Sequence, residues 1–154
     1  MDLKIVPFEA ADAEGFKEMN IAWLEKFFYV EARDEEVLGN PQKYIIQPGG
    51  HIFMAKSGRK TVGTLALIKI EEGIFELSKM AVTPEYQAKK IGQEMLKYSL
   101  DFAQSKNWKK LILYSNRKLE NAIYLYRKFG FEEVEIEKDN PYARGDIKME
   151  FPIS

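Results

Sequence analysis

Alternating apolar and polar positions, or short continuous apolar runs, mark several stretches of the chain as β-strands. The predicted strands are residues 3–7, 51–56, 61–70, 74–82, 110–115, 131–136 and 145–151. Short connections join the second, third and fourth of these strands. These three strands are therefore expected to pair with one another antiparallel.

Between the strands, apolar residues recur at helical spacing. The predicted helices cover residues 8–29 (one long helix or two), 33–40, 119–129 and a segment that starts at residue 91. A glycine follows the last apolar position of two of them, at Gly39 and Gly130, and is expected to end each helix. Residues 41–50 predict a loop that ends in a Pro-Gly-Gly sequence.

This order of elements predicts an α/β fold in which helices flank one central mixed sheet of about seven strands. Strand 74–82, the helix after it and strand 110–115 form a βαβ unit, so these two strands are expected to be parallel neighbours in an otherwise antiparallel sheet. A chain of 154 residues with 45% hydrophobic composition has enough material for one core. We therefore expect residues 1–154 to form a single domain.

Composition excludes several kinds of chemistry. The sequence has no cysteine and one histidine, His51, which argues against thiol nucleophiles, zinc–thiolate sites and a Ser-His-Asp triad. Acid–base chemistry is then expected from carboxylates, tyrosines, lysines or water, without a metal. Neither a long apolar run of about eighteen residues nor a secretory signal pattern is present, so a cytoplasmic protein without membrane contact is expected.

Charge is unevenly distributed along the chain. The formal net charge is −1, but residues 1–50 hold five basic and ten acidic residues, and residues 51–154 hold eighteen basic and fourteen acidic residues. The net charge argues against a general nucleic-acid binder, whereas the basic second part suits an anion and the acidic first part suits a cation. The charged side chains of either part could also simply be exposed to solvent without binding a ligand.

A basic loop between strand 74–82 and the helix after it is a candidate anion site. The loop, residues 87–92, reads Gln-Ala-Lys-Lys-Ile-Gly. A loop that opens a helix has free backbone N–H groups, which can bind phosphate. An ordinary strand-to-helix connection is the alternative. The loop matches neither a Walker A sequence nor a GxGxxG sequence, which argues against nucleotide hydrolysis and dinucleotide redox chemistry.

Two motifs resemble the GNAT superfamily, the GCN5-related N-acetyltransferases. Residues 80–96, MAVTPEYQAKKIGQEML, resemble the coenzyme A signature of the family, and residues 121–131, NAIYLYRKFGF, resemble its Asn-x-x-Ala-x-x-Leu-Tyr-x-x-x-Gly-Phe motif. The resemblance covers the chain from Leu3 to Phe151 and implies the GNAT fold, with acetyl-coenzyme A bound at the parallel βαβ unit. The chain departs from the signature at Lys90, where the family has its first glycine.

The resemblance also implies roles for individual residues. Backbone N–H groups of the loop and helix start would hold the pyrophosphate of coenzyme A, and the end of the strand would pair with the pantetheine arm, near which the family asparagine lies. The cofactor-binding residues implied in this way are Met80, Ala81, Val82, Gln87, Ala88, Lys89, Lys90, Ile91, Gly92, Gln93 and Asn121. Lys90 is expected to be tolerated, because backbone groups do the binding.

Two residues are candidates for acid–base catalysis. Tyr126 matches the family position whose hydroxyl lies near the thioester sulfur and protonates the departing thiolate, although a core tyrosine would fit the same helical face. Glu76 matches the catalytic glutamate of histone-type members, and a carboxylate can remove the proton from an amine nucleophile. Water is the alternative base, and a structural glutamate is the alternative role. Without cysteine, direct transfer to the amine is expected.

The acceptor is weakly indicated as a small amine or a lysine side chain. The acidic N-terminal part carries an aromatic group that could line a pocket or simply pack in the core, namely Trp23, Phe27, Phe28 and Tyr29. A non-catalytic coenzyme A binding or sensing module is the main alternative function. A basic domain that recognises RNA or another polyanion is a third, disfavoured by the net charge. Either a monomer or a homodimer is compatible with the sequence.

Overall fold

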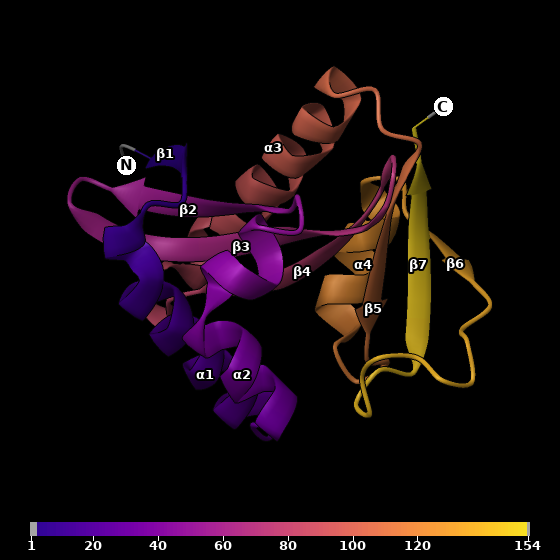
Figure 1. Cartoon of the computed structure of the whole chain (residues 1–154), viewed down its shortest axis with the longest axis horizontal. Helices are drawn as coiled ribbons and strands as arrows, with labels where there is room; N and C mark the ends of the chain where they lie inside the picture. Colours follow the sequence, from indigo (N-terminus) through magenta and orange to yellow (C-terminus); the bar gives the residue numbers. More distant parts are fainter. Residues whose placement is uncertain (1–2, 154) are drawn as a thin grey trace.

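The computed structural model describes residues 3–153, apart from the side chains of residues 87–89. Within that range a seven-stranded sheet in the order β1-β2-β3-β4-β5-β7-β6 forms the centre of the molecule (Figure 1). The strands are β1 (Leu3–Pro7), β2 (His51–Ser57), β3 (Lys60–Glu71), β4 (Ile74–Val82), β5 (Lys110–Ser115), β6 (Glu132–Val134) and β7 (Ile147–Pro152). The helices are α1 (Ala13–Phe27), α2 (Ala32–Gly39), α3 (Ile91–Ser105) and α4 (Glu120–Lys128), with the short turns η1 (Ala10–Asp12), η2 (Gln42–Ile46) and η3 (Pro84–Lys89).

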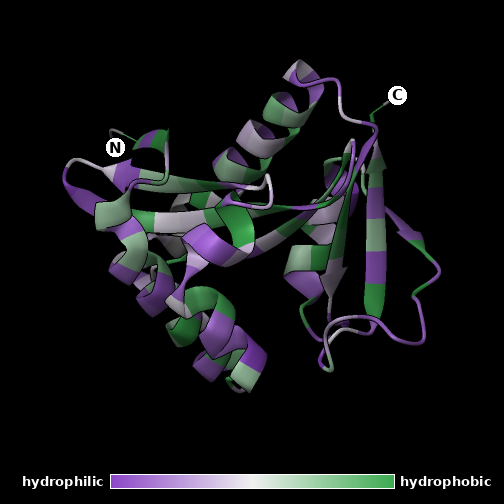
Figure 2. Ribbon diagram, in the orientation of Figure 1, coloured by the Kyte–Doolittle hydropathy of each residue, from purple (hydrophilic) through white to green (hydrophobic). Residues whose placement is uncertain are grey.

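Two hydrophobic cores lie on opposite faces of the sheet, because strand side chains alternate between the faces. In β2, Phe53 and Ala55 join the core under α3, whereas Ile52 and Met54 join the core under α1 and α2. The same alternation of hydrophobic and hydrophilic residues is visible along β7 (Figure 2). The helices thus cover both faces, and the predicted central mixed sheet flanked by helices is confirmed.

The sheet divides between β4 and β5. These two strands are parallel, as predicted, but their register contains three pairs only, from Ile74↔Lys110 to Glu76↔Ile112. Beyond Glu76, β4 stays paired with β3, and β5 stays paired with β7 along its whole length. The two parts of the sheet therefore diverge like a fork, with β1–β4 on one side and β5–β7 on the other (Figure 1).

Two predicted segments differ from the structure. The expected loop over residues 41–50 contains the π-helical turn η2, in which the Gln47 N–H donates to the Gln42 carbonyl at 2.8 Å, because Ile45 packs into the core under α1 and α2. The expected strand 131–136 is limited to β6, because β7 offers it partners only from Lys148 to Glu150. Among residues 3–153, no helix is both long enough and apolar enough to cross a membrane.

Candidate active site

A cavity opens at the fork, immediately beyond the last β4–β5 pair. Residues 76–80 of β4 and residues 113–115 of β5 line it from the sheet. The end of α1, the start of α4 and the loop between β6 and β7 complete the lining. The cavity thus joins segments from the whole length of the chain.

Glu76 lies at the apex of the fork and is only 4% exposed. The Tyr142 hydroxyl donates a hydrogen bond of 2.6 Å to its Oε2 atom. Burial raises the pKa of Glu76, and the hydrogen bond from Tyr142 and the positive charge of Lys79 offset part of this rise. A carboxyl group in this state accepts a proton more readily than an exposed glutamate does.

Tyr126 lies on α4 and lines the same cavity as Glu76. Its ring packs edge-on against Phe131, with 5.8 Å between the ring centroids. Burial raises the pKa of Tyr126 to about 12. The hydroxyl therefore stays protonated at neutral pH and can donate a hydrogen bond or a proton into the cavity.

A bulge in β4 shapes the cavity next to Glu76. The register with β3 shifts between Thr64 and Ala66, and Lys79 on β4 has a φ of 54°, in the left-handed region. Thr64 holds the bulge, because its hydroxyl donates to the Lys79 carbonyl at 3.0 Å and accepts a bond from the Asn20 side chain at 3.2 Å. The bulge brings Lys79 and Met80 both into the lining.

Beyond the bulge, the predicted anion loop has the backbone of a helix start. The turn η3 leads to Lys90, which has φ 61° and ψ 22°, and α3 follows. The Glu94 N–H donates to the Lys90 carbonyl at 3.1 Å, so the amides of residues 91–93 precede this helical hydrogen bond. Gly92 has no heavy atom within 4 Å of where a Cβ would stand. Gln87, Ala88 and Lys89, whose backbone N–H groups were predicted to bind the pyrophosphate, belong to η3, and their side chains lie outside the part of the chain that the structure describes.

The predicted acceptor residues fall into two groups. Trp23 and Phe28 line the cavity. Phe27 instead packs its ring against Trp23, with a centroid distance of 5.3 Å, and Tyr29 is 61% exposed. Asn121 is exposed, and its neighbour Ala122 lines the cavity.

Several lining residues carry no motif in the sequence. They come from five different segments and are Asn20, Lys79, Tyr114, Asn116, Tyr142 and Arg144. The loop between β6 and β7 has the charged composition of an ordinary surface loop, so nothing local marks Tyr142 or Arg144 as site residues. The charge asymmetry of the chain was the available signal, because it paired an acidic N-terminal part with a basic C-terminal part.

An ion-pair cluster joins Arg144, which lines the cavity, to two acidic residues of the N-terminal part. Arg144 donates to both carboxylate oxygens of Asp34, at 2.9 and 3.0 Å, and to Glu31 at 2.9 Å. Burial acts to raise the pKa of Asp34, but hydrogen bonds from Arg144 and the Glu31 N–H lower it below its ordinary value. These two acids are therefore already paired, and the acidic N-terminal part offers less attraction to a cationic acceptor than its composition suggests. Among the described residues, no group of three or more acidic or histidine side chains is arranged to hold a metal ion.

A comparison with known protein families identifies the class of protein to which this forked α/β fold belongs. The family model of the acetyltransferase (GNAT) domain matches residues 48–133. Because this match covers more than half of the chain, the chain belongs to the GNAT acetyltransferase family. The resemblance seen in the two sequence motifs is thereby confirmed.

A curated N-acetyltransferase is a distant relative of the chain in sequence. N-acetyltransferase family 8 member 2 of Rattus norvegicus is 23% identical over 118 residues, which cover 73% of this chain and 52% of that protein. The chain thus spans about half the length of this curated relative.

Solved structures share the fold over nearly the whole chain. A GNAT-family acetyltransferase from Staphylococcus aureus Mu50 has a TM-score of 0.88 at 20% identity, covering 99% of this chain and 100% of that chain. The PaiA N-acetyltransferase of Thermoplasma acidophilum, solved in complex with coenzyme A, has a TM-score of 0.77 at 22% identity, covering 99% of each chain.

Proposed function

We propose that this protein transfers an acetyl group from acetyl-coenzyme A directly to a primary amine, either a small amine or a lysine side chain. The observation that carries the proposal is the single cavity at the β4–β5 fork, which Glu76 and Tyr126 both line. Glu76 has the properties of a base, and Tyr126 stays protonated as a hydrogen-bond donor. They come from β4 and α4, on the two sides of the fork.

The segments around the cavity fit the cofactor. Backbone N–H groups of residues 87–93 would bind the pyrophosphate, since a helix N-terminus attracts anions. Met80, Ala81 and Val82 would pair with the amides of the pantetheine arm, along the part of β4 that β5 leaves, and Asn121 would lie near that arm. The structural neighbour PaiA, which has the same fold, holds coenzyme A.

The base is assigned from the protonation state of the acceptor. Acetyl-coenzyme A supplies an acetyl group activated as a thioester, which an unprotonated amine attacks. Amines are protonated at neutral pH, so a group in the cavity must take up the ammonium proton. Glu76, directly or through water, is the carboxylate that lines the cavity and has a raised pKa. A backbone N–H in the stretch from Met80 to Val82 would stabilise the negative charge on the carbonyl oxygen.

Tyr126 would act on the departing sulfur. The pKa of an ordinary thiol is about 8.5 and that of Tyr126 is about 12, so the hydroxyl would mainly stabilise the thiolate by a hydrogen bond. The thiolate would take the proton of Tyr126 only as the tyrosine regains one from water. The sequence has no cysteine to carry the acetyl group, which is consistent with direct transfer. Each proposed step thus uses a side chain or backbone group of the cavity.

Calorimetric titration with acetyl-coenzyme A tests cofactor binding first. Binding with a dissociation constant in the micromolar range, on the order of 10 µM, is expected. Absence of binding at protein concentrations of roughly tens of micromolar would contradict both the transferase and any sensing function.

A thiol-release screen then tests transfer. Polyamines, amino acids, aminoglycosides and lysine peptides are offered with acetyl-coenzyme A, and release is compared with hydrolysis by water alone. At least one amine is expected to raise release, and Glu76→Gln is expected to remove most of that rise. The matched control is Tyr124→Phe, because Tyr124 is 70% exposed on α4 and does not line the cavity.

A non-catalytic coenzyme A sensing module is the second candidate, and Lys90 is the observation that favours it. This lysine replaces the first glycine of the signature and adopts a left-handed conformation at the start of α3. Cofactor binding without release of thiol to any amine in the screen would support sensing over transfer.

A further inference from the structure

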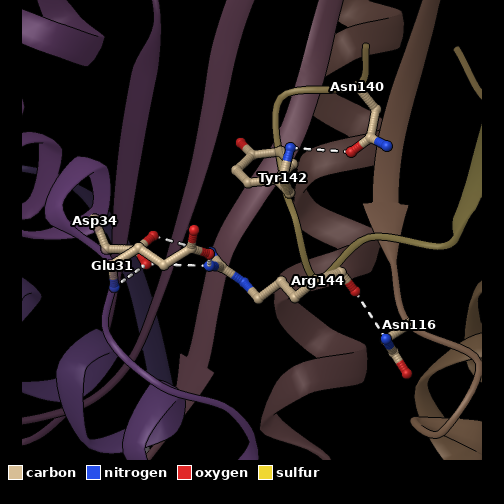
Figure 3. Close-up of polar contacts among 6 residues, drawn as sticks. All are labelled: Glu31, Asp34, Asn116, Asn140, Tyr142 and Arg144. Carbon is tan, nitrogen blue, oxygen red and sulfur yellow. Dashed lines mark hydrogen bonds and ion pairs between the residues drawn. The ribbon is translucent and has the colours of Figure 1, made fainter. Parts of the chain in front are cut away.

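The loop between β6 and β7 has one internal hydrogen bond near Tyr142 and two contacts at Arg144 that anchor it to other segments (Figure 3). The Tyr142 N–H donates to the Asn140 side chain at 3.0 Å, and the Asn116 side chain donates to the Arg144 carbonyl at 2.7 Å. The Arg144 guanidinium reaches across to Asp34 at the start of α2. Figure 3 shows these three interactions along one short stretch of the loop. Together they constrain the loop at Tyr142 and at Arg144.

Tyr142 extends from this anchored stretch to Glu76, 66 residues earlier in the chain. Its hydroxyl donates to Glu76 Oε2 at 2.6 Å, and its ring lies between neighbours, with Lys79 Nζ 5.4 Å and the Tyr114 ring 5.7 Å from its centroid. Burial and the nearby Glu76 charge raise the pKa of Tyr142 well above its ordinary value. The phenol therefore stays protonated and serves Glu76 as a donor only.

We infer that Tyr142 is the positioning residue of Glu76, fixing one carboxylate oxygen so that the other is directed to the acceptor, and that Arg144 holds Tyr142 in place. The role of this positioning in catalysis rests on the proposed function, in which Glu76 takes the proton of the amine. The effect of Tyr142 on the ionisation of Glu76 does not depend on that function. The hydrogen bond from Tyr142 stabilises the ionised form of Glu76 whether or not the protein transfers an acetyl group.

The other groups that face Glu76 do not replace this hydrogen bond. On β4, Lys79 and Ser78 favour the ionised carboxylate, and Glu137 of the β6–β7 loop opposes it. On β5, Tyr114 donates its hydroxyl to Glu137 at 2.5 Å. Burial raises the pKa of Glu76, and among the described residues the hydrogen bond from Tyr142 lowers it most. Its removal is expected to raise the pKa of Glu76.

The test is a pH titration of Glu76 in Tyr142→Phe without substrate. Carboxyl ¹³C NMR monitors the titration, and the Glu76 signal is assigned as the one that is lost in Glu76→Gln. The midpoint is expected to move to higher pH by about one unit, the size of a charge-assisted hydrogen bond. Tyr124→Phe is the matched control and should leave the midpoint in place. An unchanged midpoint in Tyr142→Phe would overturn the inference, independently of any activity.

Arg144→Gln tests the second half of the inference in the same experiment. If Arg144 acts by holding Tyr142, its replacement moves the Glu76 midpoint in the same direction, and combining it with Tyr142→Phe adds little further shift. Additive shifts, or no shift in Arg144→Gln, would remove Arg144 from this role.

Kinetics link the positioning to catalysis once an acceptor is known. In Tyr142→Phe the acidic limb of the kcat profile should move to higher pH by about one unit, while the KM for acetyl-coenzyme A stays the same. A lower rate at every pH without movement of the limb would indicate a structural role and contradict the inference. If the wild type transfers to no amine but the NMR midpoint still moves, the proposed function fails and the positioning of Glu76 by Tyr142 stands.

Discussion

Lys90 combines a departure from the coenzyme A signature with a left-handed backbone conformation. At φ 61° and ψ 22° it lies in the left-handed region, where a non-glycine residue is strained by about 1–2 kcal/mol. The signature glycine that this lysine replaces would avoid that strain. The lysine at position 90 therefore affects the strain of the backbone as well as the approach of the pyrophosphate to it.

Lys90→Gly is expected to raise the free energy of unfolding by about 0.5 kcal/mol, because the relief of strain exceeds the entropy that glycine adds to the unfolded chain. Thermal or urea denaturation measures the change. The matched control is Asn107→Gly, at φ 57° just after α3, where the gain should be smaller because asparagine tolerates this region. A loss of stability in Lys90→Gly would show that the lysine side chain makes contacts worth more than the strain.

Tyr126→Phe is expected to lower kcat on the order of 10²-fold and to leave the affinity for acetyl-coenzyme A nearly unchanged. The hydroxyl acts on the sulfur as it leaves, so its loss affects the transition state more than the bound ground state. Steady-state kinetics and calorimetry on the same variant separate the two effects. Tyr124→Phe, on the exposed face of α4, is the control, and an unchanged rate in Tyr126→Phe would exclude Tyr126 from the mechanism.

At the scale of elements, the two strands of the parallel pair were predicted with the same bounds that the structure has. Strong apolar patterns and clear stops at both ends define β4 and β5. The turn η2 was missed, because its π-helical hydrogen bond depends on Ile45 packing into a core that other elements build. Local patterns thus predicted those elements whose ends are set by local residues.

The candidate site was predictable only in part for the same reason. Glu76 and Tyr126 lie within or next to family motifs, whereas Tyr142 and Arg144 act through partners that are 66 and 110 residues away. A hydrogen bond from a loop to a distant strand or helix leaves no periodicity in either segment. The prediction that the site residues carry their assigned roles stays open to the experiments proposed above.

The ion pair between the β6–β7 loop and α2 is expected to make the free energy of unfolding depend on pH. Arg144→Gln leaves Asp34 buried without its cation and is expected to cost about 2–3 kcal/mol at neutral pH. In the wild type the pKa of Asp34 is lowered. The ion pair therefore stabilises the fold at pH values above the ordinary pKa of an aspartate. This stabilisation is lost as the pH falls through the pKa of Asp34 in the folded state. The cost of the substitution should therefore shrink below about pH 4. Urea denaturation as a function of pH measures it.

Adding Asp34→Asn to Arg144→Gln provides the control. The amide removes the unpaired charge, and its oxygen can still accept the Glu31 N–H that begins α2. At least half of the lost stability should return at neutral pH. If the double variant is no more stable than Arg144→Gln alone, the ion pair is not what holds the loop to α2.

On the scale of the whole molecule, the fork joins two parts of the sheet through few strand pairs. Three β4–β5 pairs connect them at the apex. Across the opening, Arg144 bonds to Asp34 and Glu31, and the Lys118 ammonium donates to the Phe27 carbonyl and lies 4.0 Å from the centre of the Phe28 ring. A ligand in the cavity would touch β4 on one side and α4 on the other. Its binding energy would therefore oppose the separation of the two parts.

Acetyl-coenzyme A at about 100 times its dissociation constant should stabilise the fold by about 2.7 kcal/mol, which corresponds to a rise in Tm of about 5–10 °C for a chain of this size. Because the ligand connects both sides of the fork, amide hydrogen exchange should slow in α4 and β5 as well as at the start of α3. Inorganic pyrophosphate at equal ionic strength is the comparison, since it can occupy the helix N-terminus but cannot reach across the cavity. It should slow exchange at the start of α3 only and raise the Tm less. Equal effects of the two ligands on every element would favour a polyanion-binding domain, and protection confined to α3 with acetyl-coenzyme A would mean that the fork is not the cofactor site.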